Sequence, residues 1–361
     1  MRFTPYACLF TLLTAGTAVR ATPLSELAGN MQPGQWAKLP TQNLPQVLAD
    51  GGASGHCLPF SDGAAWDPTS RRVFYIGGDH DGDSERFLSW TDNGASTWVR
   101  EPHPWVLSGS VNQNHSYDYQ AIDTAGGYYY YRTDRYDISA GTWSEITESG
   151  LPSFHRGHSA WEYFPGKGLV AIGDGGVWLL ADGASTWRTL AERAELDYTG
   201  PINTDPVAEY NPVHDVLIFG GGDESNTLYK MGRDETFTRL GTPPIAEISC
   251  GPWGTVLTVD PVSGMYLALD KAANFYQYDV TTDTWALLTD QPQPVPHFDA
   301  YFLDSTKINN VVATPVSTYG VTLFVMWNYD ESAVWLYKHA PFDGPPDGDV
   351  IPDPPQNVAV E

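Results

Sequence analysis

The sequence predicts an all-β protein, a six-bladed β-propeller whose ring is closed by an N-terminal strand. Three observations lead to this prediction: an aromatic strand that occurs six times, an apolar strand beside glycine that also occurs six times, and an abundance of turn-forming residues. The chain of 361 residues contains 35 glycines and 28 prolines, and 13% of its residues are aromatic. Many short strands at regular spacing, separated by turns, are typical of propellers and related all-β folds.

The aromatic strand is expected to be the last strand of each repeat. Counted between Trp98, Trp143, Trp187, Phe237 and Trp285, its spacing is 44 to 50 residues. Spacings in this range indicate a propeller, a solenoid or an array of repeats. The six copies lie at residues 35–39, 97–100, 142–146, 186–190, 236–240 and 284–288.

The apolar strand comes earlier in each repeat. Its continuous runs of Val, Ile, Leu, Phe and Tyr suit strands that are buried on both faces, as in sheets stacked against their neighbours. The glycines beside these runs permit tight turns and close backbone approach. The six copies lie at residues 72–79, 127–132, 168–174, 215–223, 264–270 and 320–327.

A further strand precedes each apolar strand and ends at a turn rich in Asp, Asn, Pro or Gly, which have a plain turn-forming role. These turns lie at residues 66–68, 122–124, 164–166, 210–212, 259–261 and 303–305. With one more strand between the apolar and aromatic strands, each repeat has four. The sixth repeat has no aromatic strand of its own, whereas the copy at 35–39 precedes the first repeat. We therefore expect the N-terminal strand to complete the last blade and remove its open edge.

Two repeats carry motifs of a known family. Residues 136–143 read Tyr-Asp-Ile-Ser-Ala-Gly-Thr-Trp, and residues 278–285 read Tyr-Asp-Val-Thr-Thr-Asp-Thr-Trp. Together with the paired glycines at 77–78 and 220–221, they resemble kelch repeats over roughly residues 35 to 340. Residues 92–98 and 182–187 are also similar to the Asp-box turns of sialidase-like propellers, with a different spacing. The kelch resemblance implies the propeller fold and says almost nothing about function.

The two ends of the chain differ from the repeats. Residues 1–21 begin with Met1 and Arg2, continue through an apolar stretch and end in small residues, which is the pattern of a secretory signal peptide. We expect residues 22–340 to form the propeller. Residues 341–361 are expected to form an acidic, proline-rich linker that leads toward a fibronectin type III-like module. The protein is accordingly expected to be secreted or periplasmic, and a monomer.

Charge and cysteine content narrow the range of partners. A net charge of −25 leaves no basic stripe to neutralise phosphates, so nucleic acid is not expected as a partner. The N-terminal segment is too short and too weakly apolar for membrane insertion.

Beyond the signal, Cys57 and Cys250 form either one disulfide or two unpaired buried thiols, and the sequence leaves both open.

The segments that lead into the innermost strands of a propeller share one face, which we call the lead-in face. Here these segments are rich in polar side chains that bear acid–base chemistry. They contain His56, His115, His155, His158 and His297, together with Tyr117, Asp118, Arg156, Asn203, Asp205 and Asp299. Measured back from the strand-ending turn, Asp62, Asp118 and Asp299 share one position, and His158 and His297 share another.

Three interpretations of these histidines remain open. They can be hydrogen-bonded structural groups at the mouth of the channel. They can be ligands of a transition metal assembled between blades, although tandem His-x-x-x-His spacing is missing. They can also act as acids and bases in catalysis. Separately, the oxygens of Asp79 and Asp81 beside His80 could hold a divalent metal such as Ca²⁺, although the spacing matches no calcium-loop motif.

The catalytic interpretation assigns specific roles. Removing a proton beside a uronate carboxylate needs a base, an acid for the leaving oxygen and a cation for the carboxylate. His155, Arg156 and His158 offer a base and a carboxylate clamp, His115 lies in a neighbouring segment, and Tyr117 or Tyr198 could be the acid. The residues expected to contact the sugar are His56, Asn203, Asp205, Trp253, His297 and Asp299.

We therefore expect an extracellular polysaccharide as the partner. The leading hypothesis is a polysaccharide lyase that cleaves a uronate-containing glycan by β-elimination, and the lead-in arrangement is similar to that of propeller polysaccharide lyases at the level of fold. The alternative is a non-catalytic propeller that binds a glycan or a protein. Two further hypotheses are a glycoside hydrolase that pairs Asp118 with Asp299 or Asp205, and a metal-dependent oxidase with Cys57 or Cys250 beside the channel.

Overall fold

The structure is a computed structural model of the 361-residue chain. It describes residues 21–49, 56–78, 86–102, 115–150, 159–173, 176–196, 205–222, 225–250, 255–270, 272, 274–289, 310–327 and 332–344. The expected signal peptide, except its last residue, and the linker beyond residue 344 lie outside the described residues.

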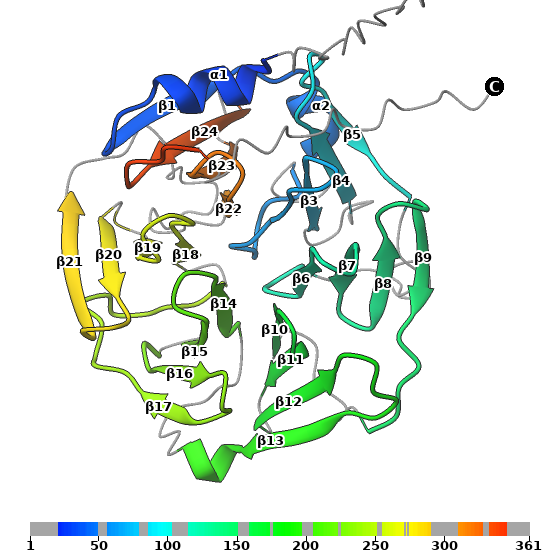
Figure 1. Cartoon of the computed structure of the whole chain (residues 1–361), viewed down its shortest axis with the longest axis vertical. Coiled ribbons are helices and arrows are strands. Elements are labelled where there is room, and N and C mark those ends of the chain that lie inside the picture. Colours follow the sequence, from blue (N-terminus) through cyan, green and yellow to red (C-terminus); the bar gives the residue numbers. More distant parts are fainter. Residues whose placement is uncertain are drawn as a thin grey trace, which may run out of the picture.

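Six four-stranded antiparallel sheets stand side by side in a ring (Figure 1). The first three blades comprise β2 (Ala65–Asp67), β3 (Arg72–Gly77), β4 (Arg86–Thr91) and β5 (Trp98–Arg100); β6 (Gln120–Asp123), β7 (Tyr128–Tyr131), β8 (Asp134–Asp137) and β9 (Thr142–Glu145); and β10 (Ser159–Phe164), β11 (Gly168–Gly173), β12 (Gly176–Ala181) and β13 (Arg188–Glu192). The last three comprise β14 (Val207–Asn211), β15 (Val216–Gly220), β16 (Leu228–Gly232) and β17 (Phe237–Arg239); β18 (Val256–Val259), β19 (Tyr266–Leu269), β20 (Phe275–Asp279) and β21 (Thr284–Thr289); and β22 (Val311–Val316), β23 (Val321–Trp327), β24 (Ser332–Lys338) and β1 (Gln35–Leu39).

The N-terminal strand closes the ring. β1 pairs antiparallel with β24, from Gln35 opposite Lys338 to Leu39 opposite Val334, and so becomes the outermost strand of the sixth blade. Trp36 packs there against Phe275, Phe324 and Tyr337, with ring centroids 4.8 to 5.4 Å apart. The prediction of six blades completed by residues 35–39 is therefore confirmed.

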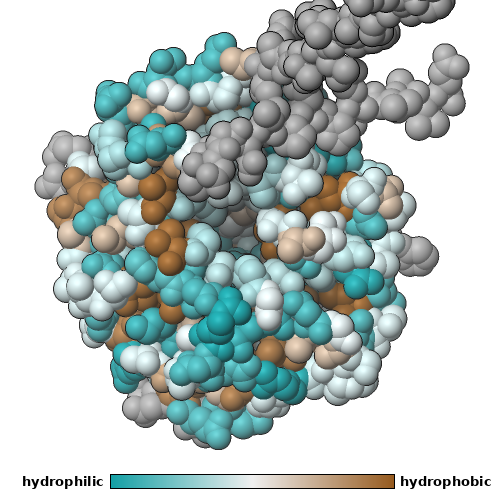
Figure 2. Space-filling view, viewed as in Figure 1, coloured by the Kyte–Doolittle hydropathy of each residue, from teal (hydrophilic) through white to brown (hydrophobic). Residues whose placement is uncertain are grey.

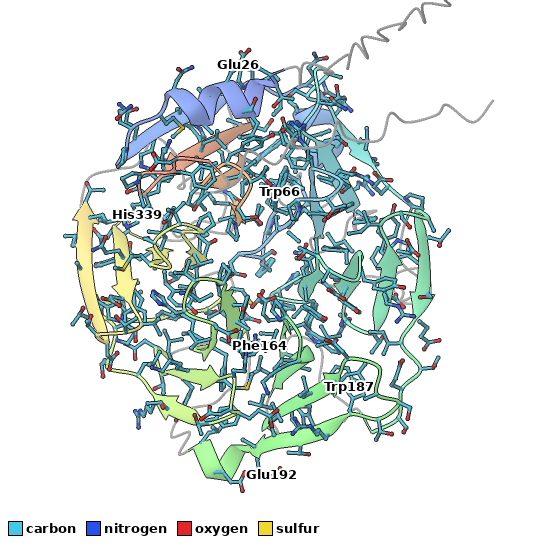
Figure 3. The ribbon with its side chains drawn as sticks, viewed as in Figure 1. Glu26, Trp66, Phe164, Trp187, Glu192 and His339 are labelled. Carbon is cyan, nitrogen blue, oxygen red and sulfur yellow. The ribbon has the colours of Figure 1, made fainter. Side chains whose placement is uncertain are left out.

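The burial of the strands follows their place in the blade. The second strands are the expected apolar runs, and every residue of β11 and β19 is buried because a neighbouring blade covers each face. The outermost strands, such as β9 and β17, are largely exposed. Figure 3 places Trp66 and Phe164, on the innermost strands β2 and β10, toward the middle of the ring, and Trp187 and Glu192 at its edge. The hydrophobic core thus lies between blades rather than at the centre.

Most of the turns that end the innermost strands have one common basis. The side chains of Asp67, Asp123, Asn211 and Asp260 accept hydrogen bonds from backbone N–H groups two or three residues further on. This is the self-capping role that Asp and Asn have in tight turns. In the third blade Phe164 takes this place, before a hairpin that is one residue shorter. The turn expected at residues 303–305 is wrong, because the innermost strand of the sixth blade, β22, ends at Val316 directly before β23. The positions that Asp299 and His297 were expected to share with residues of other blades therefore do not hold.

Two short helices at the N-terminus differ from the all-strand expectation. α1 (Pro23–Asn30) begins with a capping box in which Thr22 and Ser25 satisfy each other's backbone N–H groups, and Pro23 occupies the first turn. α2 (Leu44–Leu48) buries Leu44, Val47 and Leu48 against the first and sixth blades. The Thr-Pro-x-Ser pattern at residues 22–25 is the sequence signal for α1.

Cys57 and Cys250 are both buried, and no disulfide joins them. They lie in different hydrophobic clusters, Cys57 among residues of the first and sixth blades and Cys250 among residues of the fourth and fifth. Of the two alternatives that the sequence left open, the structure therefore excludes the Cys57–Cys250 disulfide. Among the described residues, no helix is both long and apolar enough to cross a membrane.

Candidate functional site

The described lead-in segments join neighbouring blades at the central channel. The carbonyl of Asp62 accepts a hydrogen bond from Ala313 N–H at 2.8 Å, and the carbonyl of Asp118 accepts one from Trp161 N–H at 2.7 Å. Parallel bridges between the same strands accompany these bonds. Asp62 is thus tied to the sixth blade, on one side of its own, and Asp118 to the third blade, on the other side of its own. The two aspartates lie at the same distance from their strand-ending turns, but their backbones pair with neighbours in opposite directions round the ring.

Three non-glycine residues of these segments adopt left-handed backbone conformations. Phe60, Tyr117 and Asp205 have φ angles of 60°, 41° and 61°. Such conformations are uncommon for bulky residues, and they concentrate at binding and catalytic sites that the surrounding structure holds in place. These three positions come from the first, second and fourth blades, so the lead-in segments of at least three blades hold a backbone conformation that is uncommon outside glycine.

A histidine–tyrosine pair lies on this face. The Nδ1 atom of His115 is 2.8 Å from the hydroxyl of Tyr117, and the Phe60 ring stacks on the imidazole with centroids 3.5 Å apart. His115 is 8% exposed and Tyr117 is half-buried. Packing thus fixes the imidazole while the phenol remains within reach of solvent. The two side chains form one hydrogen bond, in which either the phenol or the imidazole is the donor, depending on the tautomer of His115.

His56 has different surroundings. It is 3% exposed, its ring stacks on Trp327 at 5.1 Å, and its Nδ1 atom accepts a hydrogen bond from Leu58 N–H. Burial lowers the pKa of His56 to about 3, against a smaller opposing effect of Asn310. His56 is therefore uncharged at neutral pH. Its packing favours a structural role over direct contact with a sugar.

Two aspartates of the lead-in segments, Asp62 and Asp118, are buried close to each other. The Oδ2 atom of Asp118 accepts a hydrogen bond from Ala208 N–H, two blades away, at 2.6 Å. A β-carbon placed on Gly63, which follows Asp62 in the first blade, would lie 3.6 Å from the other oxygen of Asp118. Asp62 is 4% exposed, and its Oδ1 atom has no hydrogen-bond partner among the residues that the structure describes. The two aspartates are therefore buried side chains that are close enough for the charge of Asp62 to raise the pKa of Asp118.

Two glutamates extend the cluster along the innermost strands. Glu162 in β10 and Glu209 in β14 each lie two residues before the end of their strand. Glu162 accepts hydrogen bonds from Tyr163 N–H at 2.7 Å and from Tyr210 N–H at 3.4 Å. We call Asp62, Asp118, Glu162 and Glu209 the channel carboxyls.

Burial sets the protonation of the channel carboxyls. It raises the pKa of Asp62 to about 7 and that of Glu162 to about 8, and hydrogen bonds from backbone N–H groups only partly offset it. Burial raises the pKa values of Asp118 and Glu209 well above their ordinary range, and the charges of the other members of the cluster raise them further. Because like charges so close cannot all ionise, the cluster retains protons at neutral pH.

Residues around Cys250 border the same region. Burial and the nearby Asp62, Asp205 and Asp118 raise the pKa of the Cys250 thiol well above its ordinary value. Its Sγ atom lies 3.3 Å from the carbonyl oxygen of Pro206. Asp205 is buried, and its carbonyl accepts a hydrogen bond from Cys250 N–H. A thiol held in its protonated form is a poor nucleophile and a poor metal ligand.

The other predicted site residues fall outside the part of the chain that the structure describes. They are His155, Arg156, His158, Tyr198, Asn203, Trp253, His297 and Asp299, with Asp79, His80 and Asp81 of the proposed metal site. Among the described residues, no group of three or more His, Cys, Asp or Glu side chains is arranged to hold a metal ion.

The sequence did not predict the two glutamates of the cluster, because the predicted site covered the lead-in segments and Glu162 and Glu209 lie inside strands. Their signal is a charged residue within an otherwise apolar innermost strand, as in Trp161-Glu162-Tyr163 and Ala208-Glu209-Tyr210. When the hairpin pairs are aligned, Phe164 opposite Gly168 and Asn211 opposite Val216, both glutamates fall at the same register position.

Comparisons with known proteins identify the fold alone. A protein of unknown function from Bacteroides thetaiotaomicron matches with a TM-score of 0.54 and 13% identity, over 84% of this chain and 75% of its own. A YCF48 bound to a D1 peptide matches with a TM-score of 0.44 and 10% identity, over 88% and 98%. An oligogalacturonate lyase in complex with manganese matches with a TM-score of 0.38 and 10% identity, over 85% and 98%.

No family model and no curated protein matches the chain. The kelch resemblance therefore stays at the level of the sequence motifs. The match with a TM-score of 0.54 at 13% identity shows a similar fold and carries no residue roles from one protein to another. Function has to be argued from the site itself.

Proposed function

We propose that this protein is a secreted, carbohydrate-active propeller that cleaves a uronate-containing polysaccharide by β-elimination at its lead-in face. The observation that carries the proposal is the hydrogen bond of 2.8 Å between His115 Nδ1 and the Tyr117 hydroxyl. A phenol backed by an imidazole suits general acid–base catalysis, because the imidazole can exchange the proton that the phenol gives to substrate.

In this reaction a base removes the proton at C5, a double bond forms between C4 and C5, and the bond from C4 to the glycosidic oxygen breaks. We assign protonation of that leaving oxygen to Tyr117, with His115 replacing its proton. Removal of the C5 proton and neutralisation of the uronate carboxylate remain with the predicted His155, His158 and Arg156.

The channel carboxyls support the proposal through their charge. An anionic uronate would be repelled by several ionised carboxylates beneath the lead-in face. Because burial raises the pKa of Asp62 to about 7 and that of Glu162 to about 8, the floor of the site is largely neutral in weak acid. We therefore expect turnover of a uronate substrate to decline as the pH rises above about 7.

The test is formation of the unsaturated uronate product, followed by its ultraviolet absorbance, from pectate, alginate and glycosaminoglycans. Tyr117→Phe and His115→Gln should each reduce kcat/KM by about 10²–10⁴-fold, which is the range for a lost acid–base group. Tyr128→Phe removes a phenol from the same blade, outside the lead-in face, and should behave as wild type. The lyase proposal fails if the wild type forms no such product, or if Tyr117→Phe is fully active.

A second candidate is a non-catalytic propeller that binds a glycan or a protein on the same face. The burial of His56 against Trp327 favours it, because this lead-in histidine packs as a core residue. Retention of the protein on an immobilised polysaccharide without any turnover would support this candidate over the lyase.

A further inference from the structure

A separate cavity lies between the second and third blades. It has a volume of about 230 Å³ and is open to solvent on one side. Its walls come from β7 and β8 of the second blade, from the ends of β10 and β12 and the start of β11 in the third, and from the chain just after β9 and β12. None of the lead-in residues lines it, so the cavity is distinct from the site described above.

The polar side chains of the cavity are Arg135, Glu148 and Asp182. The Nε atom of Arg135 is buried and has no hydrogen-bond partner within the described part of the chain, while its guanidinium carbon lies 4.8 Å from the centre of the Tyr128 ring. Asp182 is held in place by Tyr163, whose hydroxyl donates to Asp182 Oδ1 at 2.8 Å. One donor and two acceptors are thus presented together, and a buried donor without a partner favours a ligand that supplies an acceptor.

The remaining walls are aromatic and aliphatic. The rings of Tyr130 and Tyr163 lie nearly parallel, with centroids 6.2 Å apart and an angle of 10° between their planes. Ile146 and Leu180 complete the apolar part. On the face of the molecule in Figure 2, hydrophobic residues likewise occur in separate groups among hydrophilic ones.

We infer that this cavity binds one neutral pyranose residue of a carbohydrate. A sugar ring combines apolar C–H faces, which pack on tyrosine, with hydroxyl groups, which donate to carboxylates and accept from guanidinium. The volume is below the range of about 300–1,000 Å³ that is usual for drug-sized ligands, and it suits a single small ring.

The formal charge of the cavity favours neutral sugars over acidic ones. One guanidinium against two carboxylates gives the cavity a formal charge of −1, so a uronate would meet net repulsion. A neutral hexose or pentose avoids this repulsion. The inference goes beyond the proposed function, since it holds whether the lead-in face is catalytic or only binds.

The experiment is saturation-transfer NMR and calorimetry on the whole protein with methyl pyranosides of glucose, galactose, mannose and xylose. Saturable binding of at least one of them is expected. Glu148→Gln and Asp182→Asn should each weaken that binding about tenfold, as expected for a lost charge-assisted hydrogen bond. The matched control is Glu145→Gln, which changes an exposed glutamate of the same blade outside the cavity and should leave affinity unchanged.

Two comparisons make the outcome decisive. Tyr117→Phe should bind the neutral sugar like wild type, so loss of turnover at the lead-in face and loss of sugar binding in the cavity are separable. Thermal unfolding without sugar should be unchanged in Asp182→Asn, because Asp182 is exposed and an amide oxygen can still accept from Tyr163. The inference is overturned if no neutral pyranoside binds, if only galacturonate or glucosamine binds, or if the two cavity variants bind as wild type does.

Discussion

Carboxyl groups in the channel and carboxyl groups in the hairpin turns respond to the fold in opposite ways. In the turns, Asp137 accepts hydrogen bonds from the backbone N–H groups of Ser139 and Ala140, and Asp279 accepts them from Thr281 and Thr282. These bonds, with those from the Ser139 and Thr281 hydroxyls, lower the pKa values of both aspartates.

In the channel, burial exceeds the stabilisation from the few available donors and raises the pKa values of all four channel carboxyls. The comparison teaches that the residue type does not determine the charge of this acidic protein. The same side chain is a fixed anion where turn N–H groups surround it, and a proton store where neighbouring blades exclude water.

The largest expected effect is on the pH dependence of folding. For the channel carboxyls the folded pKa lies above the unfolded value, so the folded state holds more protons and stability falls as the pH rises from about 4 to about 8. For Asp137 and Asp279 the folded pKa lies below the unfolded value, so stability is lost as the pH falls below about 4. Urea unfolding should show a maximum near pH 5 and a decline on the order of several kcal/mol by pH 8.

A free energy of unfolding that stays constant or rises between pH 5 and pH 8 would contradict this prediction. It would mean that the channel carboxyls ionise at their ordinary pKa values, as solvent-exposed groups do. Repeating the titration in high salt serves as a control, because screening weakens surface repulsion from the net charge of −25 much more than it affects buried groups.

The next effect concerns the glutamates of the cluster. Glu162→Gln and Glu209→Gln replace a half-buried acid, whose pKa desolvation raises, by a neutral group of the same size, so each should raise stability at pH 8 by about 1–2 kcal/mol and flatten the pH dependence. At pH 5, where the acids are already protonated, neither variant should be more stable than wild type. Glu145→Gln changes an exposed carboxylate and should have no effect at either pH. If Glu162→Gln and Glu145→Gln changed stability equally at both pH values, the channel carboxyls would not differ from exposed carboxylates.

The repeat pattern was sufficient to predict the ring, but not the cluster. Every aromatic strand of the repeat begins at or within two residues of its expected position. This agreement is possible because each blade repeats the same local sequence pattern. The same register gave Asp62 and Asp118 a common distance from their strand-ending turns. Their coupling to Glu162 and Glu209 is an electrostatic interaction among residues of four blades. A pattern within one repeat holds no information on how close these blades bring their side chains or how many hydrogen-bond donors reach them.

The smallest effect tests the turns. Asp279→Ala removes the acceptor for the N–H groups of Thr281 and Thr282 between β20 and β21, so it should cost about 1 kcal/mol, measured by urea unfolding at pH 7. Asp279→Asn keeps an oxygen acceptor and should recover most of the loss, while it removes the contribution of this residue to acid sensitivity. The opposite sign is expected from Glu162→Gln at pH 8, although both changes convert an acid to its amide. If Asp279→Asn stabilised the protein, as Glu162→Gln is expected to, the ionised carboxylate of Asp279 would be destabilising in its turn. Hydrogen bonding to the backbone would then no longer explain why the pKa values in the turns and in the channel differ.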